Sequence, residues 1–182
     1  MQTCSRRADV VAIGEDTMIT GSCLCQGIKF CVSGKLGPAV FCHCRQCQKS
    51  NGSAFATTAP VRARYFEITE GRELIREYES SPGKFRAFCS ICGSPLYSRR
   101  PAEPDTLRLR LGTLDGDPGR RPLVHVWTGA KAPWFDITDA LPRYETGGPP
   151  ATRKPGGKRG PSQSSGSAKC SSLHPPSTWL PS

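Results

Sequence analysis

Phe88-Cys-Ser-Ile-Cys-Gly-Ser94 is the most informative stretch of this sequence, because it places two cysteines on one tight turn. Two thiols at this spacing can reach one metal ion, and Gly93 allows the backbone to curl back over the sulfurs. The same C-x-x-C spacing also occurs in redox motifs, but those lie at the start of a helix in a βαβ unit. The apolar neighbours Phe88 and Leu96 predict flanking strands instead, so the stretch favours zinc over redox chemistry.

Two further cysteine clusters lie upstream, and the three clusters together hold seven of the ten cysteines. An all-thiolate donor set suits zinc or an iron–sulfur cluster. A closed structural site takes four cysteines, which leaves three for an open site of the catalytic kind, where water or substrate completes the coordination. Spacing alone does not fix the partition, but the compact run Cys42-His-Cys-Arg-Gln-Cys47 can cap an ion by itself. We therefore assign the open site to Cys42, Cys44 and Cys47, and the closed site to Cys23, Cys25, Cys89 and Cys92.

A purely structural second site, closed by a histidine, is the alternative interpretation. His43 lies between Cys42 and Cys44, and in an extended segment its side chain points away from theirs. His125 stands between two valines, which predicts a hydrogen-bonded structural histidine on a strand. We expect the three cysteines outside the clusters to bind no metal: Cys4, Cys31 and Cys170.

The chain has 182 residues, enough for one domain of ordinary size with tails. No apolar run approaches the roughly 18 residues that span a bilayer, and the N-terminal residues lack the apolar core of a secretory signal. We therefore expect no membrane partner and a cytoplasmic location, with a nuclear one left open. Cysteines in a chain without a secretion signal favour metal ligation over a disulfide framework.

Composition divides the chain into three parts. Pro, Gly and Ser make up 21 of the 38 residues in 145–182, which predicts a disordered basic tail, and residues 1–17 are expected to be a disordered N-terminal segment. The zinc domain is expected over residues 18–144, which carry +7 of the formal net charge of +10. Seven thiolates with two Zn²⁺ ions would reduce this to +4. So modest an excess does not predict a nucleic-acid partner.

Residues 18–144 are predicted to be mainly β, in mostly antiparallel sheets. Apolar residues alternate with other side chains in Ile28–Val32 and Leu107–Leu111, which is the period of a half-buried strand. One short C-terminal helix is predicted at Pro133–Leu141, with a proline at its start, acids within it and Pro142 as a stop. Further strands are predicted at Val40–Cys44, Ala54–Thr58, Tyr65–Thr69, Leu74–Tyr78, Phe85–Cys89, Pro95–Ser98 and Leu123–Trp127.

The order of the motifs resembles the family of glutathione-dependent formaldehyde-activating enzymes and centromere protein V. The resemblance implies a β-tent fold built on two zinc ions, a structural one at the C-x-C and C-x-x-C pairs and a second one at the C-H-C-x-x-C cluster. The sequence departs from the family pattern at Gln26, where glycine is usual, and at Gln48, where arginine is usual. The resemblance covers about residues 18–144 and rests on Gly21-Ser-Cys-Leu-Cys25, Cys42-His-Cys-Arg-Gln-Cys47, Phe88-Cys-Ser-Ile-Cys-Gly-Ser94, Gly112-Thr-Leu-Asp115, Lys131-Ala-Pro-Trp134 and Asp139-Ala-Leu-Pro142.

This resemblance implies a zinc-dependent carbon–sulfur lyase-type enzyme that acts on a thiol–carbonyl adduct such as S-hydroxymethylglutathione, formed from glutathione and formaldehyde. A thiol that binds Zn²⁺ loses its proton, so we expect a substrate thiolate beside Cys42, Cys44 and Cys47. Arg45, Lys49 or another basic residue is expected to meet the carboxylates of the tripeptide. Centromere protein V suggests the alternative, a non-catalytic zinc-binding module for chromatin, microtubules or an acidic partner. An enzyme for another thiol or carbonyl compound is a third hypothesis, and the oligomeric state is not predicted.

Overall fold

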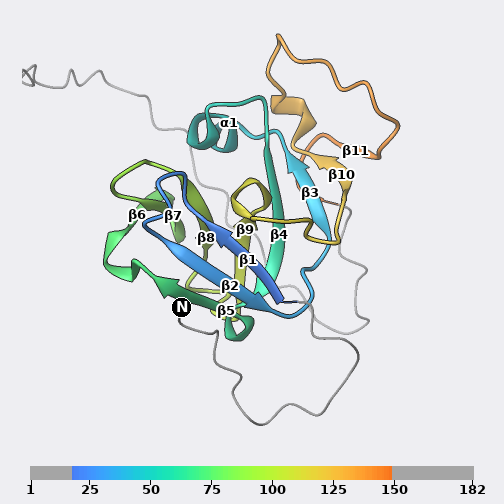
Figure 1. Ribbon diagram of the computed structural model, residues 1–182. Helices are drawn as coiled ribbons and strands as arrows, with labels where there is room; N and C mark the ends of the chain where they lie inside the picture. Colours follow the sequence, from blue (N-terminus) through green and yellow to red (C-terminus); the bar gives the residue numbers. More distant parts are fainter. Residues whose placement is uncertain (1–17, 149–182) are drawn as a thin grey trace, which may run out of the picture. The chain divides into compact units, whose positions relative to one another are not determined.

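The described part of the chain, residues 18–148 of a computed structural model, is built mainly from β-strands in two sheets (Figure 1). The smaller sheet has the order β1-β2-β5, with strands Met18–Ser22, Lys29–Ser33 and Phe66–Glu70. The larger sheet has the order β11-β10-β3-β4-β9-β8-β7-β6. Its strands in chain order are β3 Ala39–Cys42, β4 Ala56–Arg62, β6 Ile75–Ser81, β7 Lys84–Cys89, β8 Pro95–Arg99, β9 Thr106–Arg110, β10 Pro122–Val126 and β11 Arg143–Tyr144.

These strands confirm the prediction of a mainly β fold, and the two sheets agree with the tent that the resemblance implied. Every predicted strand overlaps an observed one, from β2 to β10, while β1 and β11 are additional. Most neighbouring strands are antiparallel, but β10 pairs in parallel with both β3 and β11. The β3–β10 register places His125 opposite Phe41, and therefore close to the cysteine cluster that follows β3. Within residues 18–148, no helix has the length and apolar character needed to cross a membrane.

The α-helix of the described residues, α1, spans Arg45–Asn51 and follows β3 (Figure 1). Cys44 is its N-cap, because its sulfur accepts a hydrogen bond from the Cys47 N–H. Gly52 ends the helix in the left-handed conformation, with φ 60°. Short 3₁₀ helices add η1 Ala63–Tyr65, η2 Arg72–Leu74, η3 Leu111–Thr113 and η4 Thr128–Ala130.

The prediction of a C-terminal helix at Pro133–Leu141 is wrong, because these residues form irregular structure. The Asp139 carboxylate accepts a hydrogen bond from the Leu141 N–H at 2.9 Å. Arg143 donates to the carbonyls of Ile137 and Asp139, each at 2.9 Å. Side-chain hydrogen bonds thus take the place of a helical ladder, and the β-branched Ile137 also disfavours one.

The hydrophobic core is formed by apolar side chains from both sheets. Phe30 of β2, Leu96 of β8 and Leu109 of β9 belong to one cluster and are at most 1% exposed. Cys23 and Cys89 belong to the same cluster and are equally buried. Two of the predicted zinc ligands therefore lie at the edge of the core, where a metal ion would join the small sheet to the large one.

Candidate metal centres and the adjoining pocket

Four of the predicted ligands converge from two turns and form what we call the four-cysteine group. Cys23 and Cys25 lie in the turn after β1, Cys89 ends β7, and Cys92 lies in the turn before β8. Their sulfur atoms all lie within 4.8 Å of one another. The separation is 3.4 Å between Cys23 and Cys25 and 3.8 Å between Cys25 and Cys89.

Left-handed backbone residues close both turns of this group. Gly93 has φ 73°, and its N–H donates to the Cys89 carbonyl at 2.9 Å. Gln26 has φ 59°, and its N–H donates to the Cys23 carbonyl at 2.9 Å. The Ile28 N–H donates to the Cys23 sulfur at 3.3 Å. The left-handed conformation at Gln26 is the one that glycine adopts most easily, which explains why glycine is usual at this position of the family pattern.

The remaining three ligands form the three-cysteine group, which joins a strand to a helix. Cys42 ends β3, Cys44 caps α1, and Cys47 lies in its first turn. Their sulfur atoms also lie within 4.8 Å of one another, with 3.6 Å between Cys42 and Cys44. The structure thus brings together the same two sets of residues that the sequence assigned to the closed and the open site. Cys31 lies buried in β2, outside both groups, and is disulfide-bonded rather than a spare thiol, whereas Cys4 and Cys170 lie outside the described residues.

Both groups fit a tetrahedral thiophilic ion. Zn–S bonds of about 2.3 Å place the sulfurs of a tetrahedral site about 3.8 Å apart. The observed separations of 3.4, 3.6 and 3.8 Å are close to this value. Thiols this close together cannot all ionise unless a cation balances their charge. Zinc binds cysteine as the thiolate, so a zinc ion would meet this requirement.

Neighbouring thiols and two arginines act on the Cys47 thiol of the three-cysteine group. Hydrogen bonds from Cys42 and Cys44 lower the pKa of Cys47 far below its ordinary value, and the charges of Arg110 and Arg86 lower it further. Its hydrogen bonds to Cys44 and Cys47, followed by burial, raise the pKa of Cys42 well above the ordinary range. The protein therefore stabilises a thiolate at this position with arginine side chains as well as with neighbouring thiols.

The sequence analysis missed these two arginines. Arg86 lies on β7 and Arg110 on β9, and they are only 6% and 4% exposed. The guanidinium nitrogens of Arg86 lie 3.9 and 4.0 Å from the Cys47 sulfur. The alternation of leucine and arginine in β9 predicts arginines facing solvent, so only the position of β9 relative to α1 could have identified Arg110 as a buried residue.

Two histidines and an aspartate form a hydrogen-bonded chain behind the three-cysteine group. The His43 Nε2 and His125 Nδ1 atoms are 2.8 Å apart, and His125 Nε2 lies 3.0 Å from the Asp139 carboxylate. Since the carboxylate accepts, His125 carries its proton on Nε2 and accepts from His43 on Nδ1. Burial, followed by the charges of His125 and Lys131, lowers the pKa of His43, so this fully buried ring is neutral.

These contacts give both histidines a structural role. The His43 side chain points away from the sulfurs of Cys42 and Cys44, as the sequence predicts, and its ring centroid lies 5.4 Å from that of Phe55. His125 is the hydrogen-bonded strand histidine that its valine neighbours predict. Neither belongs to the groups of possible metal ligands among residues 18–148.

Gln48 stands where the family pattern usually has arginine. Its side chain is buried and forms hydrogen bonds to the backbone. Its amide nitrogen donates to the carbonyls of His43 at 2.5 Å and Ala130 at 2.8 Å. Its amide oxygen accepts from Arg45 at 2.6 Å. Arg45 and Lys49 are exposed on α1 and do not line the pocket described next, so the geometry does not support them as the carboxylate contacts.

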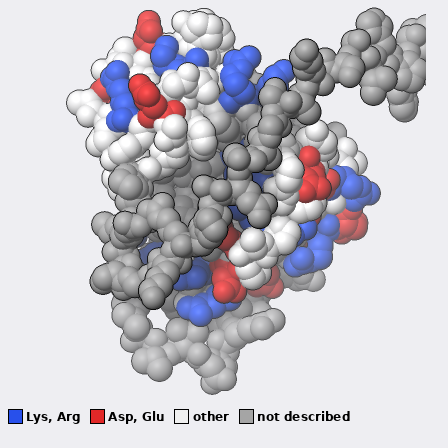
Figure 2. Space-filling model, turned by 180° about the vertical axis from the view of Figure 1, so that it is seen from behind, with Lys and Arg blue, Asp and Glu red and all other residues white. Residues whose placement is uncertain are grey.

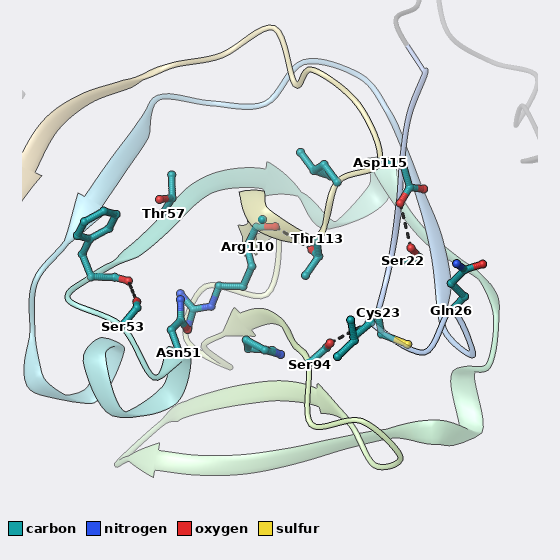
Figure 3. A pocket seen from close by; sticks show the side chains of 15 residues that line it. Ser22, Cys23, Gln26, Asn51, Ser53, Thr57, Ser94, Arg110, Thr113 and Asp115 are labelled. Atoms are coloured by element: carbon teal, nitrogen blue, oxygen red, sulfur yellow. Dashed lines mark hydrogen bonds between the residues drawn. The ribbon is translucent and has the colours of Figure 1, made fainter.

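A pocket of about 660 Å³ is lined by Cys23 of the four-cysteine group and by Arg110 (Figure 3). The three-cysteine group does not line it, but the charge of Arg110 acts on Cys47. Its walls come from the turn after β1, the end of α1 with the start of β4, the Ser94 turn, and the segment after β9. Arg110 and Asp115 are its charged lining residues, and Figure 3 shows the Arg110 side chain reaching toward Asn51, away from Asp115. The other lining residues are Ser22, Cys23, Leu24, Gln26, Ser53, Phe55, Thr57, Ser94, Pro95, Gly112, Thr113 and Leu114.

The surface charge of the described residues is mixed where Figure 2 displays it. Basic and acidic side chains are interspersed on that face, without a continuous basic stripe over the described residues (Figure 2). Some charged side chains of the described residues form ion pairs. Arg99 pairs with Glu77, and Arg121 pairs with Asp117 with 2.7 Å between the guanidinium nitrogen and the carboxylate oxygen.

Taken together, the fold and the two groups define a small β domain with two cysteine clusters that could each hold a metal ion. The model of the glutathione-dependent formaldehyde-activating enzyme family matches residues 18–130. The chain is also similar to a Halomonas elongata protein provisionally named a glutathione-dependent formaldehyde-activating enzyme. The two sequences are 30% identical over 129 residues, and the alignment covers 66% of this chain and 81% of that protein. The chain belongs to this family.

A solved structure resembles the fold in part. The crystal structure of a Rhodobacter sphaeroides protein aligns with a TM-score of 0.46 and 22% sequence identity. The alignment covers 54% of this chain and 89% of that one.

Proposed function

We propose that the chain is a zinc-dependent carbon–sulfur lyase-type enzyme acting on a thiol–carbonyl adduct such as S-hydroxymethylglutathione. The observation that carries this proposal is the three-cysteine group, whose convergent sulfurs have no fourth cysteine, histidine or carboxylate ligand among residues 18–148. Three protein ligands with an open position are typical of catalytic zinc. The family name supports glutathione and formaldehyde as the two reactants.

A zinc ion held by Cys42, Cys44 and Cys47 would supply the Lewis-acid chemistry that converts a bound thiol to a thiolate at neutral pH. Arg86 and Arg110 place positive charge beside Cys47, which favours an anionic sulfur in this region. In the addition direction, a bond forms between the glutathione sulfur and the formaldehyde carbon, and the carbonyl oxygen takes a proton. The reverse reaction cleaves the same carbon–sulfur bond and returns the proton.

The four-cysteine group would hold the second, structural zinc ion in this proposal. Its buried members Cys23 and Cys89 are part of the hydrophobic core, so loss of the ion would uncouple the two sheets. Unpaired zinc-binding thiols require reducing conditions, and a cytoplasmic location is therefore part of the proposal.

Metal analysis combined with exchange NMR of formaldehyde and glutathione tests the function. We expect two zinc ions per chain and exchange between free formaldehyde and S-hydroxymethylglutathione that is faster with the protein than without it. Cys47→Ser should retain the fold, lose the second ion and abolish the acceleration. Cys170→Ser, which removes a thiol outside both groups, is the matched control and should retain both ions and the activity.

Two zinc ions with unchanged exchange would refute the enzyme and favour the non-catalytic binding module. One zinc ion in the wild-type protein would refute the open site itself. An exchange rate that Cys47→Ser leaves unaltered would show that the reaction does not use the three-cysteine group.

A further inference from the structure

Arg110 is the unusual residue of the pocket, because it is buried without the partners that a guanidinium normally has. It is 4% exposed, and its Nε and Nη2 atoms have no hydrogen-bond partner among the described residues. Its cation interacts with the Cys47 side chain, through its charge and a hydrogen bond, but this leaves Nε and Nη2 without a partner among the residues that the structure describes. A buried charge with unsatisfied donors is costly unless a ligand completes its hydrogen bonds.

A second unsatisfied group lies at the same place. The Oδ1 atom of Asn51 is buried and also lacks a partner among residues 18–148. Asn51 ends α1 and lines the same pocket as Arg110, whose side chain reaches toward it in the view of Figure 3. Two residues of the pocket lining thus carry two buried N–H donors on a cation and one buried carbonyl acceptor without partners among the described residues.

Several other polar groups of the pocket are already hydrogen-bonded. The Ser22 hydroxyl donates to Asp115 at 2.9 Å, and the Thr113 hydroxyl donates to the Arg110 carbonyl at 2.8 Å. Ser94 Oγ accepts from the Leu24 N–H at 2.9 Å. Among the pocket-lining residues, the buried side-chain atoms without a partner in the described part of the chain are those of Arg110 and Asn51.

A role for Arg110 as a mere counter-ion of the thiolates does not account for these free donors. Arg86 already directs both terminal nitrogens at the Cys47 sulfur, at 3.9 and 4.0 Å. The two unpartnered nitrogens of Arg110 form one edge of its planar fork, which matches the two oxygens of a carboxylate.

We propose that Arg110 and Asn51 form a carboxylate-binding subsite for a peptide-like thiol, with Arg110 Nε and Nη2 on the carboxylate and Asn51 Oδ1 on an adjacent N–H of the ligand. Asp115, the acid of the same pocket, suits the ammonium group of such a ligand. The pocket volume of about 660 Å³ lies within the range of small-molecule sites. The assignment rests on the proposed function and names the part of the protein that would hold the substrate while its sulfur reaches the three-cysteine group.

Binding of an unreactive analogue separates the subsite from catalysis. S-methylglutathione and its diester are titrated against the zinc-loaded protein by calorimetry or NMR. We expect the wild-type protein to bind the free acid about tenfold or more tightly than the diester, because esterification removes the charge that Arg110 recognises. Arg110→Gln should weaken binding of the acid to the level of the diester, so that the preference disappears.

Two further variants keep the test decisive. Arg121→Gln removes an exposed arginine that is paired with Asp117, and it should retain the full preference. Asn51→Ala should weaken both ligands by a similar factor of about three to ten, because it removes a contact to the ligand N–H and not to its carboxylate. If Arg110→Gln fails to fold, Arg110→Lys, which retains the charge but not the fork, should show a preference at least threefold smaller than wild type.

Equal affinity of the wild-type protein for acid and diester, or binding of neither, overturns the subsite even if formaldehyde exchange is accelerated. A preference that survives Arg110→Gln or Arg110→Lys unchanged also overturns it. Conversely, the wild-type protein could show the Arg110-dependent preference for the acid without accelerating formaldehyde exchange. That result refutes the proposed reaction but supports the subsite.

Discussion

Gly71 and Gly83 are a natural pair for testing how the four-cysteine group depends on close backbone packing. Both have left-handed conformations, with φ 70° and 67°. A Cβ at Gly71 would lie 1.9 Å from the Gly27 carbonyl oxygen, whereas a Cβ at Gly83 would meet nothing within 4 Å. Gly71→Ala and Gly83→Ala therefore impose the same backbone strain but differ in steric overlap.

The expected magnitudes follow from these two terms. The left-handed conformation costs an alanine about 1–2 kcal/mol, which is the whole expected loss for Gly83→Ala. Overpacking adds about 1–3 kcal/mol at Gly71, so Gly71→Ala should lose about 2–5 kcal/mol. At about 3 °C per kcal/mol for a chain of this size, the melting temperature should fall by about 3–6 °C for Gly83→Ala and about 6–15 °C for Gly71→Ala.

Thermal unfolding followed by circular dichroism measures both values, and zinc content provides a second readout. Gly27 lies two residues after Cys25, and the next residue, Ile28, donates its N–H to the Cys23 sulfur. Gly71→Ala should therefore also weaken zinc retention in the presence of a chelator, while Gly83→Ala should not. Equal losses of melting temperature in the two variants would refute the steric argument, and the same would hold if both variants released zinc at the wild-type rate.

Three further predictions concern the sites themselves. Cys92→Ser should unfold the domain in circular dichroism, because structural zinc contributes on the order of 10–16 kcal/mol against a net stability of about 5–15, whereas Cys47→Ser should remain folded; equal loss of structure would contradict a non-structural second site. His125→Ala should lower the free energy of unfolding in urea by about 1–3 kcal/mol, since it leaves the buried His43 Nε2 without its partner, and a loss below about 0.5 kcal/mol would contradict the hydrogen-bonded chain. Burial lowers the pKa of Lys84, and nearby guanidinium groups lower it further. The charged form of Lys84 therefore opposes folding, and the folded state gains stability as the pH rises toward 10.5 and this charge is lost. Lys84→Met should therefore add about 0.5–1 kcal/mol at pH 7, and this advantage should shrink as urea unfolding is repeated at increasing pH; an advantage that grows instead would reverse the sign of the argument.

Much of the metal chemistry could be predicted from sequence because it depends on short spacings. Cys23 and Cys25, or Cys89 and Cys92, lie so close along the chain that a single turn brings each pair together. The alternation in Leu107–Leu111 likewise predicts a strand, and β9 confirms it. These are local properties, and local stereochemistry determines them.

The residues that could not be predicted owe their environment to contacts between distant segments. Arg110 belongs to the polar side of an alternating strand, yet it is buried because β4 and the end of α1 lie beside it. Helix α1 has only seven residues, too few for a hydrophobic period, and its signals are a cysteine N-cap and the glycine that follows it. The segment Pro133–Leu141 has acids and flanking prolines like those of a helix, but its polar groups are satisfied by side chains such as Asp139.

The two cysteine groups differ in how their negative charge is balanced, and this difference supports separate roles. The four-cysteine group is bonded by backbone and hydroxyl groups, such as the Ile28 N–H on Cys23 and Ser94 beside Cys92, which suits a static site. Three thiolates with one divalent zinc ion would carry a single negative charge, which the two buried guanidiniums of Arg86 and Arg110 exceed by one. Because a buried excess charge is costly, the proposed open site is electrostatically complete only when one further anion arrives. A substrate thiolate would supply that charge as the fourth ligand of the ion.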